Sequence, residues 1–121
     1  MNELNYASLE ASKKLVDNGI VLETEFYWCK DESVGWYLRD ESTYSLDVHE
    51  SIPAPCFTEV WRELPEEITY KERTAELYLL KMGGETICGY DIYNDAIHLE
   101  QNVNPTDALI ELLVWVKGAG K

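Results

Sequence analysis

The two histidines are the residues of this chain that could most readily serve as metal ligands or as half of an acid–base pair. His49 stands between Asp47 and Glu50, and His98 precedes Glu100 by two positions. A histidine beside a carboxylate can exchange a proton near neutral pH. Neither cluster has the spacing of a ligand motif such as HxxxH or HExxH. We therefore interpret both clusters as polar surface residues in loops and predict no metal site.

Two further patterns resemble ligand loops only in part. Asp91, Asn94 and Asp95 could offer oxygen atoms to calcium, but their spacing is wrong and lacks the glycine and the final glutamate of an EF-hand loop, so we interpret this segment as a turn. Gly83-Gly84 lacks the lysine of a phosphate loop and is a strong signal for a two-residue hairpin turn. No GxSxG nucleophile motif is present. We predict no catalytic, cofactor-binding or metal-binding residue and no cofactor, and we expect a protein that is not an enzyme.

Aromatic residues gather in the first half of the chain, where they could stack on nucleic-acid bases. The set comprises Phe26, Tyr27, Trp28, Trp36 and Tyr37. Stacking platforms normally lie in a positively charged groove, whereas this chain has a formal net charge of −13, from 10 basic and 23 acidic residues. We interpret the aromatics as a core layer with one exposed edge. We expect no binding to DNA, RNA or anionic membranes.

The composition is that of one globular domain. The chain has 121 residues, of which 45% are hydrophobic, and we predict a single domain spanning residues 1–121. The N-terminal sequence lacks the basic start of a signal peptide, and no apolar run reaches membrane-spanning length. Cys29, Cys56 and Cys88 are scattered without CxxC spacing, which predicts reduced thiols. These features predict a cytoplasmic protein.

The segment from Asn104 to Val116 is the clearest element of secondary structure. Asn104 is a good N-cap, Pro105 suits the first helical position, and Asp107 lies where the helix dipole favours negative charge. The sequence predicts a helix that begins after Asn104 and ends near Val116, ahead of two glycines.

Most of the circumference of this helix is apolar, which indicates burial on more than one side. Its main face carries Leu109 and Leu112, which we place in the core. Ile110 and Val114 fall outside that face. If no other element covers this pair, it could form a protein interface, and a homodimer would be the commonest arrangement.

Hydrophobic periodicity divides the rest of the chain into helices and strands. A symmetric register places Trp28 opposite Val34 in the first predicted hairpin, and the glycine pair places Leu80 opposite Ile87 in the second. The predicted elements are a helix over Leu4–Asp17, a hairpin of Ile20–Trp28 with Val34–Arg39, a short strand at Tyr44–Val48, a helix over Cys56–Leu64, a strand at Ile68–Lys71, a hairpin of Glu76–Met82 with Glu85–Tyr90, and an irregular segment or edge strand over Asp91–Val103.

The second hairpin decides the predicted architecture, because it is apolar on both faces and strands of that kind are covered on both sides. One weakness is that Glu76 would lie opposite Asp91. We predict an α+β fold with an antiparallel sheet of five to six strands and three helices on both of its faces, as in an αβα sandwich, or with one face closed by a partner protein.

Two segments, IPAPCFTEVWRELPEEI (Ile52–Ile68) and NPTDALIELLVWVK (Asn104–Lys117), are similar to parts of small uncharacterised proteins of bacterial prophages and mobile elements. These proteins resemble the group described as phage αβα-sandwich domains. The resemblance implies a fold and a genomic neighbourhood, and it implies no activity and no site residues.

We therefore expect a non-enzymatic accessory protein of prophage or mobile-element type that acts through protein contacts. Two alternatives stay open. One is an acidic inhibitor that mimics nucleic acid and binds a host nucleic-acid enzyme. The other is a small enzyme or ligand-binding domain, which would hold His49 or His98 with a carboxylate in a deep pocket.

Overall fold

The structure is a computed structural model that describes residues 5–31, 33, 35–40 and 50–119. The predicted strand at Tyr44–Val48 lies outside the described residues. Within these ranges the elements are, in order, α1 (Leu9–Asp17), β1 (Phe26–Asp31), β2 (Gly35–Asp40), β3 (Glu50–Pro53), α2 (Phe57–Trp61), β4 (Glu67–Tyr70), β5 (Arg73–Met82), β6 (Glu85–Ile92), β7 (Asp95–Asn102) and α3 (Pro105–Ala119).

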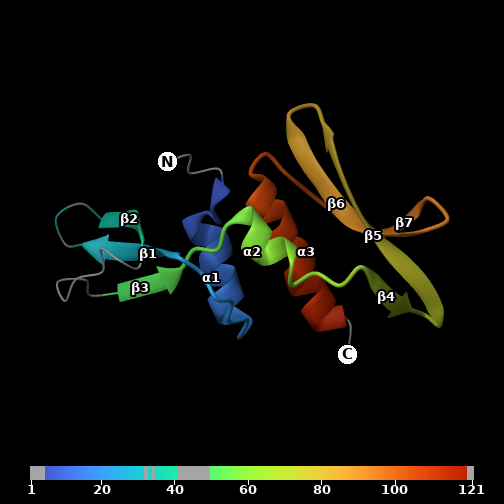
Figure 1. Ribbon diagram of the computed structural model, residues 1–121, viewed down its shortest axis with the longest axis horizontal. Coiled ribbons are helices and arrows are strands. Elements are labelled where there is room, and N and C mark those ends of the chain that lie inside the picture. Colours follow the sequence, from blue (N-terminus) through green and yellow to red (C-terminus); the bar gives the residue numbers. More distant parts are fainter. Residues whose placement is uncertain (1–4, 32, 34, 41–49, 120–121) are drawn as a thin grey trace.

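The helices form the middle of the molecule, between two antiparallel sheets (Figure 1). The small sheet has the strand order β2-β1-β3, and the large sheet has the order β4-β5-β6-β7. The α+β class is confirmed, but two sheets stand in place of the predicted single sheet with helices on both faces. The apolar circumference of α3 gives the reason, because Leu109, Ile110 and Leu112 are all fully buried. The helices therefore form one layer, and the two sheets cover it from both sides.

The small sheet has a different register from the predicted one. Trp28 of β1 lies opposite Leu38 of β2 rather than Val34, and opposite Ile52 of β3 on its other side. The β1–β2 hairpin closes at Gly35, whose φ of +81° a glycine adopts readily. The shift is an even number of residues, so the predicted faces are retained although the predicted pairs are not. Residues 20–25 precede β1 rather than belonging to it.

The large sheet is a meander whose strands are joined by two-residue turns. The predicted register of its central hairpin is confirmed, with Leu80 opposite Ile87 and the turn at Gly83-Gly84. The other two turns, Lys71-Glu72 and Tyr93-Asn94, also have positive φ at both positions, although neither contains glycine. The segment predicted as irregular or as an edge strand contains β7, which pairs with β6 at the edge of the sheet.

The predicted start of α3 is confirmed. The Asn104 Oδ1 atom accepts hydrogen bonds from the backbone N–H of Thr106 at 2.9 Å and of Asp107 at 3.2 Å. The helix continues to Ala119, past the predicted end near Val116. No described helix is both long and apolar enough to cross a membrane.

The first two helices are shorter than predicted: α1 begins later, after its N-cap Ser8, and α2 ends earlier, at Trp61 instead of Leu64. The Ser8 side chain caps α1 by accepting from the Ala11 N–H at 3.1 Å. At α2, the backbone N–H of the N-cap Cys56 donates to Glu59 Oε1 at 2.8 Å, which is half of a capping box.

The contact between α1 and α3 joins the first and the last helix of the described chain. Asp107 Oδ1 accepts from the Ser8 N–H at 2.8 Å, and Lys14 forms an ion pair with Glu111. Burial raises the pKa of Asp107, although its hydrogen bonds with Ser8 act in the opposite direction. Ile110 is fully buried in this region and Val114 is partly buried. Ile110 is therefore core and Val114 packs against the core, so the interface and the homodimer suggested for an uncovered pair lose this support.

Candidate functional site

Of the two histidine clusters, the one at His98 lies within the described residues, whereas His49 and Asp47 do not. The His98 ring stacks on Trp115 of α3, with ring centroids 4.2 Å apart and planes 4° apart. Its Nε2 atom lies 2.6 Å from Glu100 Oε2. His98 thus lies on a strand, packed between the large sheet and α3, rather than in the surface loop that the sequence predicted. The pair has the chemistry to share a proton, and the stack gives the ring a packing role.

The residues that resemble a calcium loop surround the turn between β6 and β7. Asp91 lies opposite Ala96 and Asp95 lies opposite Ile92, with Asn94 in the turn itself. The interpretation of this segment as a turn is confirmed. Within the described part of the chain, no group of three or more His, Cys, Asp or Glu side chains is placed to hold a metal ion.

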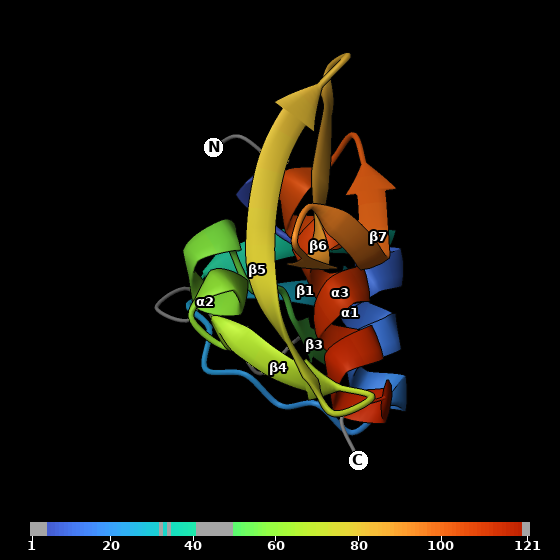
Figure 2. The same cartoon turned by 90° about the vertical axis from the view of Figure 1, so that its right-hand side faces the viewer.

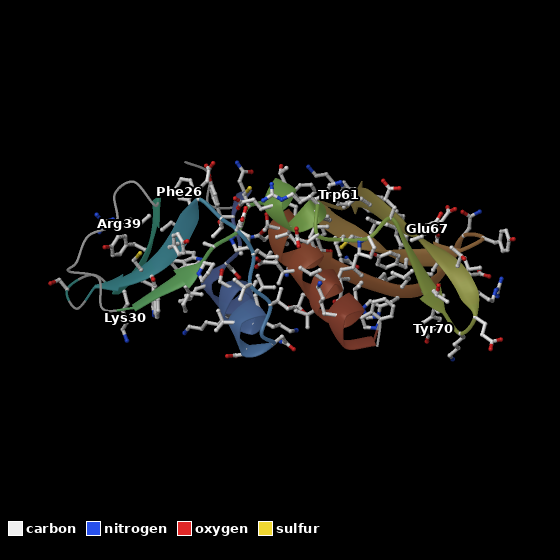
Figure 3. The ribbon with its side chains drawn as sticks, turned by 60° about the horizontal axis from the view of Figure 1, so that its bottom comes forward. Phe26, Lys30, Arg39, Trp61, Glu67 and Tyr70 are labelled. Carbon is white, nitrogen blue, oxygen red and sulfur yellow. The ribbon has the colours of Figure 1, made fainter. Side chains whose placement is uncertain are left out.

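The predicted aromatic set lies on the small sheet, at the opposite end of the molecule from Glu67 and Tyr70 of β4 (Figure 3). The Trp28 Nε1–H donates to the Ala7 carbonyl at 2.8 Å, which fixes the strand to the start of α1. The Nζ atoms of Lys13 and Lys30 lie 5.2 and 5.9 Å from the ring centroid of Trp36. Folding therefore brings cations from α1 and β1 to one ring, which the linear sequence did not predict.

The three cysteines are free; Cys29 and Cys88 are buried, and Cys56 is partly buried. Burial raises the pKa of Cys88 to about 12, and the nearby Glu100 carboxylate adds to the increase. A thiol with this pKa is protonated at neutral pH and is a poor nucleophile.

The large sheet has an apolar face that the described helices leave uncovered. The other face of the large sheet packs on α3. There Cys88 and Tyr90 are fully buried, and the ring centroids of Tyr90 and Trp115 lie 6.2 Å apart. Side chains alternate along a strand, so their neighbours point away from α3. Figure 2 looks onto this side, with α3 behind the sheet. We call it the outer face, and its apolar residues are Tyr78, Leu80, Met82, Ile87 and Leu99.

The centre of the outer face is built around a glycine. Tyr78, Gly89 and Leu99 lie side by side on β5, β6 and β7. A β carbon at Gly89 would lie 2.2 Å from the His98 carbonyl oxygen and 3.0 Å from Tyr78 Oη, so the Tyr78 side chain occupies this space. Burial raises the pKa of Tyr78, and the Asp91 carboxylate adds to the effect. The phenol is therefore neutral and able to donate a hydrogen bond near neutral pH.

One end of the outer face is acidic. Glu67, Glu76 and Asp91 lie next to one another across β4, β5 and β6. The pairing of Glu76 with Asp91, which the sequence predicted as a weakness, is confirmed. Like charges on neighbouring strands repel each other, so this row is a place where a cation would be favourable.

A groove lies beneath the tip of the β5–β6 hairpin, on the side of the helices. The tip projects beyond the N-terminal end of α3 in both ribbon views (Figures 1 and 2). The groove has a volume of about 590 Å³, and its apolar lining includes Phe57, Leu79, Val103 and Pro105. Apolar surface is thus exposed on both sides of the hairpin tip.

Comparison of the chain with protein-family models, with curated proteins and with solved structures finds no match. The candidate site is therefore defined by geometry alone, and it is the outer face. The sequence did not identify these residues as functional. The only relevant indication in the sequence was that both faces of the second predicted hairpin are apolar. The sequence alone did not show which of the two faces the helices would leave uncovered.

Proposed function

We propose that this chain is a non-enzymatic accessory protein that binds another protein through the outer face of its large sheet. One observation carries the proposal. Leu80, Leu99 and Met82 share this face and are 41%, 47% and 64% exposed. A contiguous apolar surface with a polar rim is typical of a protein interaction site.

The charges beside the outer face support a partner of particular chemistry. The row of Glu67, Glu76 and Asp91 borders the apolar residues, and the chain as a whole carries a net charge of −13. A partner surface with an apolar centre and lysine or arginine along one edge would match both features. Attraction at a distance would also speed the encounter with such a basic partner.

The proposed setting is the cytoplasm of a bacterium that carries a prophage or mobile element. This part of the proposal rests on the resemblance of Ile52–Ile68 and Asn104–Lys117 to small prophage proteins.

Capture and calorimetry test the proposed function. The immobilised chain is used to capture partners from a bacterial lysate, and a captured protein is then purified and titrated against the free chain. Burial of the outer face predicts a negative heat-capacity change on binding. Leu99→Asp should weaken binding about tenfold or more, because a buried leucine contributes roughly 1.5–3 kcal/mol.

The matched control is Val21→Asp, which introduces the same charge at a residue that is 87% exposed and lies outside both sheets. This variant should bind as the unmodified chain does. Equal binding by Leu99→Asp and the unmodified chain, or equal losses in the two variants, would remove the outer face from the proposal.

A further inference from the structure

The edge of β5 is paired along only part of its length. β4 pairs with β5 from Arg73 to Glu76, and the Leu77 N–H then donates to the Glu66 carbonyl at 2.9 Å. Beyond this bond, no described strand lies beside residues 78–82 on that side. Figure 2 shows β4 along the lower part of one edge of β5, whereas beside the upper part of β5 only β6 is drawn, on the opposite edge.

The open edge presents backbone groups that can pair with another strand. Successive residues of an antiparallel strand direct their N–H and C=O groups to opposite sides. The Leu77 N–H points toward β4, so the backbone groups of Leu79 and Lys81 point to the same side, where no described strand meets them. An unpaired edge of this kind is a template for strand addition.

The chemistry of the open edge favours a second copy of the chain. Residues 78–82 read Tyr-Leu-Leu-Lys-Met and contain no carboxylate, although the chain has 23 acidic residues. Two copies of so acidic a chain repel each other over most of their surface. They can approach along this segment without placing one carboxylate against another.

We propose that two copies of this chain pair antiparallel through residues 78–82 of β5, with Leu80 on the two-fold axis, and join their large sheets into one continuous sheet. This inference goes beyond the proposed function, because it uses the edge of the sheet and needs no other protein. A two-fold pairing is self-complementary, as most homodimer interfaces are.

The register follows from the groups that are free. A two-fold axis at Leu79 would place Lys81 opposite Leu77, whose N–H is already bonded to Glu66. An axis at Lys81 would bring the two ammonium groups together. With the axis at Leu80, Leu79 lies opposite Lys81 of the second copy, and each of these two pairs exchanges both backbone hydrogen bonds.

The side chains fit this register on both faces. On the outer face, Leu80 meets Leu80 of the second copy, and Tyr78 meets its Met82, so all the pairs are apolar. On the other face, Leu79 of the second copy is added beside the groove of about 590 Å³, whose lining includes Phe57 and Val103. The dimer therefore extends the outer face and also covers part of the exposed apolar surface at the hairpin tip.

The net charge predicts how salt acts on the dimer. Each copy carries −13, so added salt screens their repulsion and should strengthen the pairing. A complex with a basic partner at the outer face should weaken in the same salt, because there the screened interaction is attractive. The sign of the salt dependence separates the two associations.

Sedimentation of the purified chain tests the edge with a matched pair of variants. The unmodified chain should be dimeric at about 0.1 mM, a concentration that populates any dimer with a micromolar Kd. Lys81→Pro removes an N–H that points to the open edge, a position that tolerates proline, and should raise the Kd about tenfold or more. Lys81→Ala removes the same side chain but keeps the N–H, and it should remain dimeric.

A charge exchange tests the register. Leu80→Asp and Leu80→Lys each place like charges together on the two-fold axis, so each variant alone should be monomeric. An equal mixture should form a heterodimer, because the opposite charges then meet. This test holds even if Lys81→Pro fails to fold, a point that circular dichroism decides.

Three outcomes would overturn the inference: a monomeric unmodified chain at about 0.1 mM, a dimer that Lys81→Pro leaves intact, or no heterodimer in the mixture. None of these results bears on the proposed function, which is tested by Leu99→Asp and a captured partner. Conversely, Leu99→Asp should remain dimeric, because Leu99 lies on β7 away from the β5 edge.

Discussion

The two sheets differ in how they meet the apolar core that surrounds α3. The large sheet contributes four buried residues to this core, and no described residue of the small sheet belongs to it. The four are Ala75, Cys88, Tyr90 and Ile92. The small sheet is attached differently. The Trp28 Nε1–H donates to the Ala7 carbonyl at 2.8 Å, and the Ala7 N–H donates to the Pro55 carbonyl, just after β3, at 2.8 Å. One sheet is held mainly by burial, and the other is held largely by directed hydrogen bonds.

The difference concerns what each attachment controls. Burial of apolar area is non-directional and provides most of the free energy of folding. A hydrogen bond contributes less net free energy but fixes an orientation. We therefore expect the large sheet to unfold only when the whole protein unfolds, whereas the small sheet can open at a lower free-energy cost.

Leu112→Ala should break the core on which the large sheet depends. Leu112 of α3 is fully buried, and its truncation should lower the free energy of unfolding by roughly 2–5 kcal/mol. A denaturant melt measures this loss, and Val16→Ala, at a residue that is 52% exposed, is the control. A loss below about 1 kcal/mol would place Leu112 outside the core.

Tyr90→Phe tests a polar group in the buried attachment of the large sheet. The Tyr90 hydroxyl donates to the Pro65 carbonyl at 2.7 Å, and the residue is fully buried. Removing the hydroxyl leaves that carbonyl without its donor, which should cost about 1–3 kcal/mol in a melt at neutral pH. An unchanged unfolding midpoint would mean that a water molecule replaces the hydroxyl. The contact between the large sheet and α3 would then admit water in spite of its burial.

Trp28→Phe should sharpen the contrast by loosening the small sheet alone. The variant keeps an aromatic ring but loses the hydrogen bond to Ala7, a loss of about 0.5–1.5 kcal/mol. Amide hydrogen exchange should speed up in β1 and β3 and remain unchanged in β5 and β6. Equal acceleration in both sheets would show that they unfold as one unit.

Alkaline pH should weaken the large sheet gradually. The pKa of Cys88 rises from 9.0 to about 12 on folding, so the folded chain keeps a proton that the unfolded chain releases. The stability that this group contributes is complete below pH 9, and it declines as the pH rises toward about 12. Denaturant melts between pH 9 and about 12 should show that Cys88→Ala loses less stability than the unmodified chain. An equal loss of stability in the two proteins would contradict the role of Cys88.

Local chemistry determined which elements could be predicted from the sequence. The capping of α3 by Asn104 and the register around Gly83-Gly84 depend on residues a few positions apart, and both were predicted correctly. The β1–β2 register was not predicted correctly. Periodicity defines only the faces of a strand, whereas the pairing partners depend on where the hairpin closes, which is at Gly35. The turn at Tyr93-Asn94 contains no glycine, so the sequence indicated a turn near Asn94 but did not define the beginning of β7.

The arrangement of the layers and the candidate site depended on contacts between distant parts of the chain. Periodicity showed that α3 was apolar nearly all round, but not that Ile110 would be fully buried. The apolar pattern of the central hairpin was likewise visible, including Leu80 opposite Ile87. Which side would face α3 was decided by packing, so the outer face emerged only from the structure.

The order of the elements along the chain has a consequence for synthesis on the ribosome. The strands of the large sheet emerge before α3, and their two-residue turns let neighbouring strands pair early. Until α3 emerges, Cys88 and Tyr90 face water on one side of the sheet while Leu80 and Leu99 face it on the other. The nascent chain therefore passes through a stage with two bare apolar faces, a state that chaperones recognise and that aggregates when they are scarce.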